Sequence, residues 1–170
     1  AAITSVKIKG VVHEFSTIPG VKEDLTDILL NLKTVAVKVH SPGLKKMYLK
    51  SNGSGELRAG NFETDSETEI MNPDQLIMTL DSNADIEIEA NVETGKGYVS
   101  AEIAEDENKI IGEIKLDAMF SPVIKTSYKV ENSRVGQVTD YDKLIFEVET
   151  NGVITPDDAI ALAARILQDQ

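Results

Sequence analysis

Residues 13–33 read HEFSTIPGVKEDLTDILLNLK, and this stretch predicts a turn that leads into a helix. The turn is centred on Pro19 and Gly20, because proline presets φ and glycine tolerates a positive φ. After the turn, apolar residues recur at helical spacing and form one stripe: Val21, Leu25, Ile28, Leu29 and Leu32. We therefore expect an amphipathic helix that this stripe anchors to the body of the protein.

The opposite face of the expected helix is polar and carries Asp24, Asp27 and Asn31. A loop with a single aromatic residue, HEFST at residues 13–17, precedes it. The acidic residues Glu23 and Asp24 lie near the helix start, where the helix dipole favours negative charge. The polar face is either an ordinary solvated surface, as most charged helix faces are, or a contact surface for a partner.

The composition narrows the classes of function that the chain can have. Its 170 residues include 17 basic and 29 acidic residues, for a formal charge of −12, and no cysteine. The absence of cysteine excludes disulfides, thiolate zinc sites and a cysteine nucleophile. The acidic charge argues against autonomous binding to nucleic-acid phosphates, which needs clustered Lys and Arg. No apolar run reaches the roughly 20 residues of a membrane-spanning helix, and no leader pattern opens the chain.

Most of the chain shows the alternation of β-strands. We expect a strand with one buried face at residues 3–12, where Thr4, Val6, Ile8 and Val12 lie on one side. Residues 51–61 are glycine-rich and predict a loop. Further strands are expected at residues 35–40, at 47–51 as part of a hairpin, at 75–80 as a central strand, and at 86–92, 114–118, 124–130 and 144–148.

A final helix has a clear start signal, with Thr155 as N-cap, Pro156 in the first turn and two aspartates after it. Its apolar surface is wider than one core face needs. The helix is either buried within its own domain or packs against a helix of another chain. The chain opens without Met and closes inside this helical pattern, so we expect it to be a fragment of a longer protein.

A search for catalytic and metal-binding motifs finds none. Asp81, Asn83 and Asp85 imitate the start of an EF-hand loop, but Ile86 and Val92 stand where that loop needs glycine and glutamate. The glycine pairs at 53–55 and 95–97 lack the frame of a nucleotide-binding loop. We therefore predict no active site, no metal and no cofactor.

Several stretches, in order, resemble the N-terminal domain of the bacterial and plastid DNA-directed RNA polymerase alpha subunit. Besides residues 13–33, they are EIMNPDQLIMTLD (69–81), VETGKGYVSAE (92–102), LDAMFSPV (116–123), YKVENSRVGQVTDYDKL (128–144) and TNGVITPDDAI (150–160). The resemblance implies an α+β fold, with a β-rich insert subdomain at residues 1–120 followed by part of the α/β dimerisation subdomain at 121–170. Relatives also carry an N-terminal segment ahead of the position of Ala1 and a C-terminal DNA- and activator-binding domain, and we expect neither within these 170 residues.

The resemblance implies a cytoplasmic, non-catalytic assembly scaffold that dimerises with a second alpha subunit and recruits the beta and beta′ subunits, without binding DNA directly. It assigns large-subunit contacts to His13, Glu14, Phe15, Ser16, Thr17, Asp24, Asp27 and Asn31. Arg134, Gln137 and Asp140 are further candidates, although their run also fits a simple hairpin loop. Dimerisation residues would be Ile160, Ala163, Ala164 and Leu167.

Two other functions fit the composition without the resemblance. One is a stand-alone acidic β-rich protein-binding module. The other is a small hydrolase, for which the sequence offers no acid–base or nucleophile pair.

Overall fold

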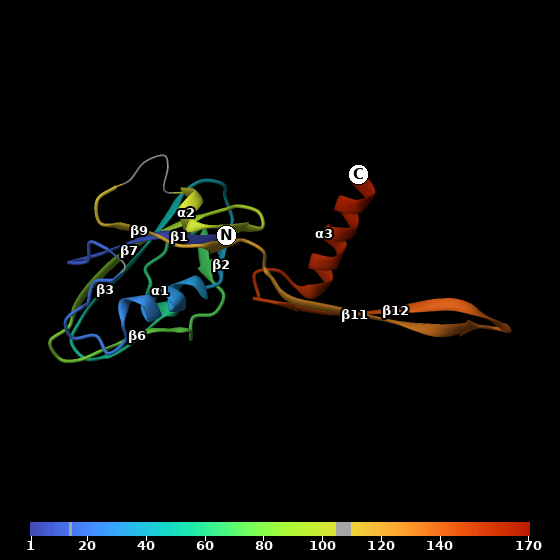
Figure 1. The fold of residues 1–170 in the computed structure, drawn as a ribbon, viewed down its shortest axis with the longest axis horizontal. Coiled ribbons are helices and arrows are strands. Elements are labelled where there is room, and N and C mark those ends of the chain that lie inside the picture. The colour runs from blue at the N-terminus through green and yellow to red at the C-terminus, as the bar shows by residue number, and fades with distance from the viewer. Residues whose placement is uncertain (14, 105–109) are drawn as a thin grey trace. The chain divides into compact units, whose positions relative to one another are not determined.

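The computed structural model describes residues 1–13, 15–104 and 110–170, and these form two compact units, Ala1–Ser121 and Pro122–Gln170. Strands predominate, with a few helices, so the fold is α+β as the sequence indicates (Figure 1). The first unit contains the His13–Lys33 stretch, and the second contains a long hairpin and the terminal helix.

An antiparallel four-stranded sheet, in the order β3-β7-β1-β9, forms the centre of the first unit. Its strands are β1 (Ala2–Ile8), β3 (Lys45–Asn52), β7 (Asp85–Glu93) and β9 (Glu113–Lys115). Three two-stranded ladders flank it: β2 (Val37–Val39) with β5 (Thr68–Ile70), β4 (Gly55–Arg58) with β6 (Leu76–Leu80), and β8 (Tyr98–Val99) with β10 (Ala118–Met119). The helices are α1 (Leu25–Lys33), the 3-10 turn η1 (Ala59–Asn61) and α2 (Ala101–Ala104).

The hydrophobic core lies between α1 and the strands. Leu25, Ile28, Leu29 and Leu32 of α1 are buried, as the apolar stripe predicts, and the helix contacts β6 and β1. Burial of this stripe removes several large side chains from water, each worth about 1.5–3 kcal/mol. Alternation in β7 is also confirmed, because Ile86, Ile88, Ala90 and Val92 are all buried.

The prediction of one buried face in β1 is wrong. The pairing register of β1 with β7 shifts between Ile3 and Ser5, which moves side chains from one face to the other. As a result Ile3 and Ser5 are as buried as Val6, while Val12 lies beyond the strand and is exposed. The Ser5 hydroxyl accepts a hydrogen bond from Asn91 Nδ2 at 2.9 Å, which satisfies this buried polar group.

Three other strand predictions are corrected by long-range pairing. β3 pairs with β7 rather than forming a hairpin with β2. The glycine-rich run expected to be a loop contains β4 and η1, because β4 finds its partner in β6. β6 is not a central strand: β4 covers one side, and on the other the described residues show a single bridge between Leu80 and Val21.

The turn before α1 is confirmed and is tightly packed. Gly20 has a φ of 79°, and a Cβ there would lie 2.7 Å from the Asp81 carboxylate and 2.9 Å from the Ala84 backbone. Only glycine avoids both the backbone strain and this contact.

Glu23 does more than complement the helix dipole. Its carboxylate accepts hydrogen bonds from Thr79 N at 2.7 Å and from Thr79 Oγ1 at 2.9 Å, which tie the start of α1 to β6. Partial burial raises the pKa of Glu23, but the hydrogen bonds from Thr79 outweigh it, so the pKa lies below its ordinary value.

The second unit consists of β11 (Val123–Val135), β12 (Val138–Thr150) and α3 (Pro156–Asp169). The two strands form a hairpin with an aromatic pair, Tyr128 and Phe146, whose ring centroids are 6.4 Å apart. Thr155 caps α3 as predicted, because its Oγ1 accepts from Asp158 N at 3.3 Å. No residue of α3 is buried, so the interpretation of a helix buried within its own domain is wrong.

Candidate protein-interaction surface

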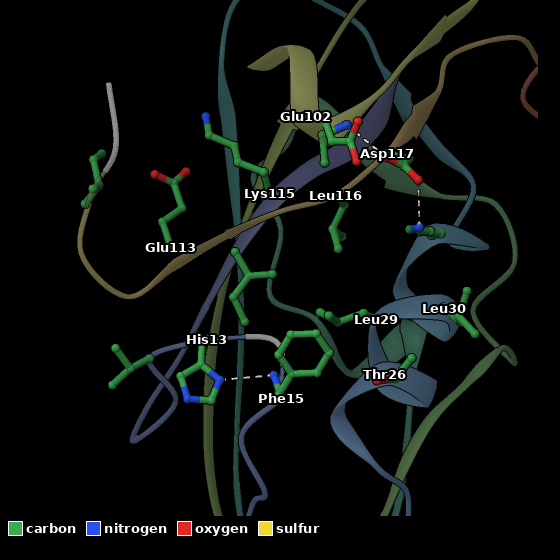
Figure 2. A pocket seen from close by; sticks show the side chains of 15 residues that line it. His13, Phe15, Thr26, Leu29, Leu30, Glu102, Glu113, Lys115, Leu116 and Asp117 are labelled. Atoms are coloured by element: carbon green, nitrogen blue, oxygen red, sulfur yellow. Dashed lines mark hydrogen bonds and ion pairs between the residues drawn. The ribbon is translucent and has the colours of Figure 1, made fainter. Parts of the chain in front are cut away.

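The loop before α1 places an aromatic side chain in solvent. His13 Nδ1 accepts a hydrogen bond from the Phe15 backbone N–H at 3.2 Å and lies 3.5 Å from Ser16 Oγ. The two rings lie 6.3 Å apart (Figure 2). Phe15 is 79% exposed, although it is held by this turn. A large apolar ring exposed to water on an anchored backbone is typical of a residue that packs against a partner.

Phe15 lies on the rim of a groove of about 420 Å³. Helix α1, the His13 loop and the segment around β9 form its walls (Figure 2). Three further rim residues, Val12, Leu30 and Ile110, are more than half exposed. The lining residues are Val12, His13, Phe15, Thr26, Leu29, Leu30, Lys33, Ala101, Glu102, Ile110, Glu113, Ile114, Lys115, Leu116 and Asp117.

Asp117 holds one end of the groove together. Its carboxylate accepts from the Ala101 backbone N–H at 2.8 Å and from Lys33 Nζ at 3.3 Å. The Ala101 N–H, and more weakly the Lys33 ammonium, hold the pKa of Asp117 below its ordinary value against the effect of partial burial. The carboxylate therefore links the end of α1 to the start of α2, and all three residues line the groove.

The remaining residues predicted from the His13–Lys33 stretch lie in different environments. Thr17, Asp24 and Asp27 are exposed, and Ser16 is half-buried. Asn31 is half-buried, and its Nδ2 donates to the Ile77 carbonyl at 3.0 Å, so this amide already has a partner within the chain. Glu14 lies outside the described residues.

The other predicted contacts belong to the second unit. Arg134, Gln137 and Asp140 are exposed at the tip of the β11–β12 hairpin, where Gly136 has a φ of 62° and Arg134 Nε donates to its carbonyl at 2.7 Å. The prediction of a hairpin loop at this run is confirmed, and it does not exclude a contact role. The four predicted dimerisation residues are all exposed on α3: Ile160, Ala163, Ala164 and Leu167.

Sequence reasoning missed most of the groove. Leu30 was outside the apolar stripe, and Ile110, Lys115 and Leu116 were not connected with the helix. The one available signal for Leu30 was its position, because it is an apolar residue on the polar face of an amphipathic helix. The strands around Ile110–Asp117 meet α1 only through tertiary packing.

The described residues contain no metal-binding cluster and no membrane-spanning helix. Among them, no cluster of three His, Cys, Asp or Glu side chains could hold a metal ion. The loop that imitates an EF-hand is a tight turn, in which the Asp81 carboxylate accepts from Asn83 N at 2.8 Å. No described helix is long and apolar enough to cross a membrane.

The described residues form an α+β fold with an apolar groove that has an exposed aromatic residue on its rim. Residues 6–121 match the family described as the RNA polymerase Rpb3/RpoA insert domain. This match covers more than half of the chain, so the chain belongs to that family and is an alpha-type N-terminal domain of RNA polymerase. Alpha-type subunits are non-catalytic and assemble with other subunits of the polymerase.

Proposed function

We propose that this chain is an assembly scaffold of a DNA-directed RNA polymerase of bacterial type, acting in the cytoplasm. Residues 1–120 recruit the large beta and beta′ subunits, and residues 121–170 take part in dimerisation with a second alpha subunit. The observation that carries the proposal is Phe15, which is held by the His13 turn yet is 79% exposed on the rim of an apolar groove. Membership in the insert-domain family supports the same reading.

The proposed recruiting surface combines the rigid helix α1 with exposed apolar side chains. Four buried side chains hold α1 in place, so Asp24 and Asp27 are presented at a fixed position. Phe15 and Leu30, which line the groove, supply exposed apolar area. An apolar centre bordered by polar groups is the usual anatomy of a protein interface.

The experiment is size-exclusion chromatography with light scattering of the chain, alone and mixed with purified beta subunit. We expect co-elution, and we expect Asp27→Arg to abolish it. The matched control is Asp74→Arg, which makes the same charge change at an exposed acid in the turn before β6, outside α1 and outside the predicted contact residues. A folded chain that does not co-elute with the beta subunit would contradict recruitment of that subunit and favour the stand-alone binding module.

Dimerisation is tested on the same instrument. Leu167 is 78% exposed, so Leu167→Glu should remove any self-association through α3 without unfolding the chain. Gln168→Glu adds the same charge at the next position and serves as control. Equal self-association of both variants would show that α3 is not the dimer contact.

A further inference from the structure

The two edges of the central sheet differ in how they are covered. At the β3 edge, Tyr48 and Glu63 exchange two backbone hydrogen bonds, of 3.1 and 2.7 Å, which cap the strand. At the other edge, β9 pairs with β1 alone within the described part of the chain. Natural proteins generally cover or blunt such edges, because an open edge pairs readily with another strand.

The register of β9 shows which of its backbone groups are free. Leu116 N donates to Thr4 O at 2.9 Å, and Ile114 lies opposite Val6, so these even-numbered residues face β1. In an antiparallel pair the residues between them point their N–H and C=O groups the other way. The N–H and C=O of Lys115 are therefore directed away from β1, and no described residue bonds to them.

This open edge borders the apolar groove. Ile114 and Leu116 turn their side chains into the core on the α1 side and also line the groove, as Figure 2 shows for Leu116 beside Leu29. Side chains that are neighbours across two strands share one face of a sheet. A strand added to β9 would thus place alternate side chains in the groove, against Leu30 and Phe15.

The charges on the rim indicate the chemistry of such a segment. Lys33 is already paired with Asp117. Among the other charged residues that line the groove, the two carboxylates of Glu102 and Glu113 outnumber the single ammonium of Lys115. The chain as a whole carries a charge of −12. A segment with apolar residues at alternate positions and a basic residue beside them complements this rim.

We propose that the β9 edge captures an extended, apolar and basic segment of a large RNA polymerase subunit as an added β-strand, whose side chains fill the groove. This inference rests on the proposed recruitment of the large subunits and specifies how one of them is held. Backbone hydrogen bonds to Lys115 provide binding, and the groove selects the side chains.

The test uses the whole chain and purified beta and beta′ subunits, added separately. Lys115→Pro removes the outward N–H, and proline is tolerated at such an edge position because the ladder to β1 does not use that N–H. Lys115→Ala loses the charge and keeps the N–H. We expect Lys115→Pro to bind at least about tenfold more weakly than Lys115→Ala, as loss of a strand-pairing donor implies.

Hydrogen–deuterium exchange of the unaltered chain gives a second readout that does not depend on the variants folding. On binding, deuterium uptake across Glu113–Asp117 should slow at least about tenfold, since a bonded amide exchanges only after opening. A complex in which this uptake is unchanged would overturn strand addition and leave recruitment intact. Failure to form any complex would refute recruitment itself. Protection that grows with the concentration of the chain alone would assign the edge to a second copy and overturn the inference.

Discussion

Replacement of Phe15 by alanine should weaken binding of a large subunit strongly and leave folding almost unchanged. A phenylalanine offers about 200 Å² of surface. With 79% of it exposed, about 160 Å² is available for burial, worth at most about 4 kcal/mol at about 25 cal/mol per Å². Interface anchors of this kind cost about 2 kcal/mol or more when truncated. We therefore expect affinity to fall between about 30-fold and about 900-fold.

The assay is a surface-binding titration of the chain against purified beta subunit, with a thermal melt of each variant. Tyr48→Ala is the control, because Tyr48 is also an exposed aromatic residue, 46% exposed, but does not line the groove. It should bind like the unaltered chain. If Phe15→Ala and Tyr48→Ala bind equally well, the exposed ring is not an anchor and the reasoning from exposure to function is wrong.

Three predictions concern stability. Gly20→Ala should lower the unfolding free energy by about 1–3 kcal/mol more than Gly10→Ala, because both glycines have a φ near 80° but only Gly20 lacks room for a Cβ. Denaturant titration compares the two variants, and equal losses of unfolding free energy would refute the steric argument. Because the pKa of Glu23 is lowered in the folded state, the ionised Glu23 carboxylate stabilises the fold above the ordinary pKa of 4.5, and this stabilisation is lost as pH falls through the folded pKa. Glu23→Gln should therefore reduce the loss of stability at acid pH, as measured by thermal melts across pH. An unchanged pH profile would show that the Thr79 contacts contribute nothing. Ile28→Ala should cost about 2–5 kcal/mol by leaving a cavity in the core, measured by urea unfolding, and a loss under about 1 kcal/mol would mean that α1 is not anchored as described.

Elements with strong local patterns could be predicted from the sequence. The stripe of α1, the alternation of β7 and the cap of α3 each arise from neighbouring residues, and each is confirmed. The incorrect strand predictions occur where a strand distant in the sequence determines the pairing. A strand was missed at Gly55–Arg58 because its glycine-rich start resembles a loop until β6 pairs with it.

The same division holds for the interaction surface. His13, Phe15 and Asp27 were candidates because the family resemblance assigns contacts to this stretch of the sequence. The groove itself depends on Ile110–Asp117, nearly a hundred positions away from the His13 loop. No local periodicity relates the two, because the distance between them is set by the order of strands in the sheet.

By itself, the sequence determined the amphipathic helix, the alternating strands, the acidic character and the family resemblance. The helix and the strands follow from side-chain periodicity and the acidic character from composition, which are local properties. The family resemblance rests instead on matching stretches of residues in the same order. Only the tertiary structure decided which strands pair, which face of β1 is buried, and where the sheet is left with an open edge beside an apolar groove. The physical reason is that strand pairing and register are settled by the combined burial of residues distant in sequence, and a one-residue shift such as that between Ile3 and Ser5 exchanges the faces of a strand.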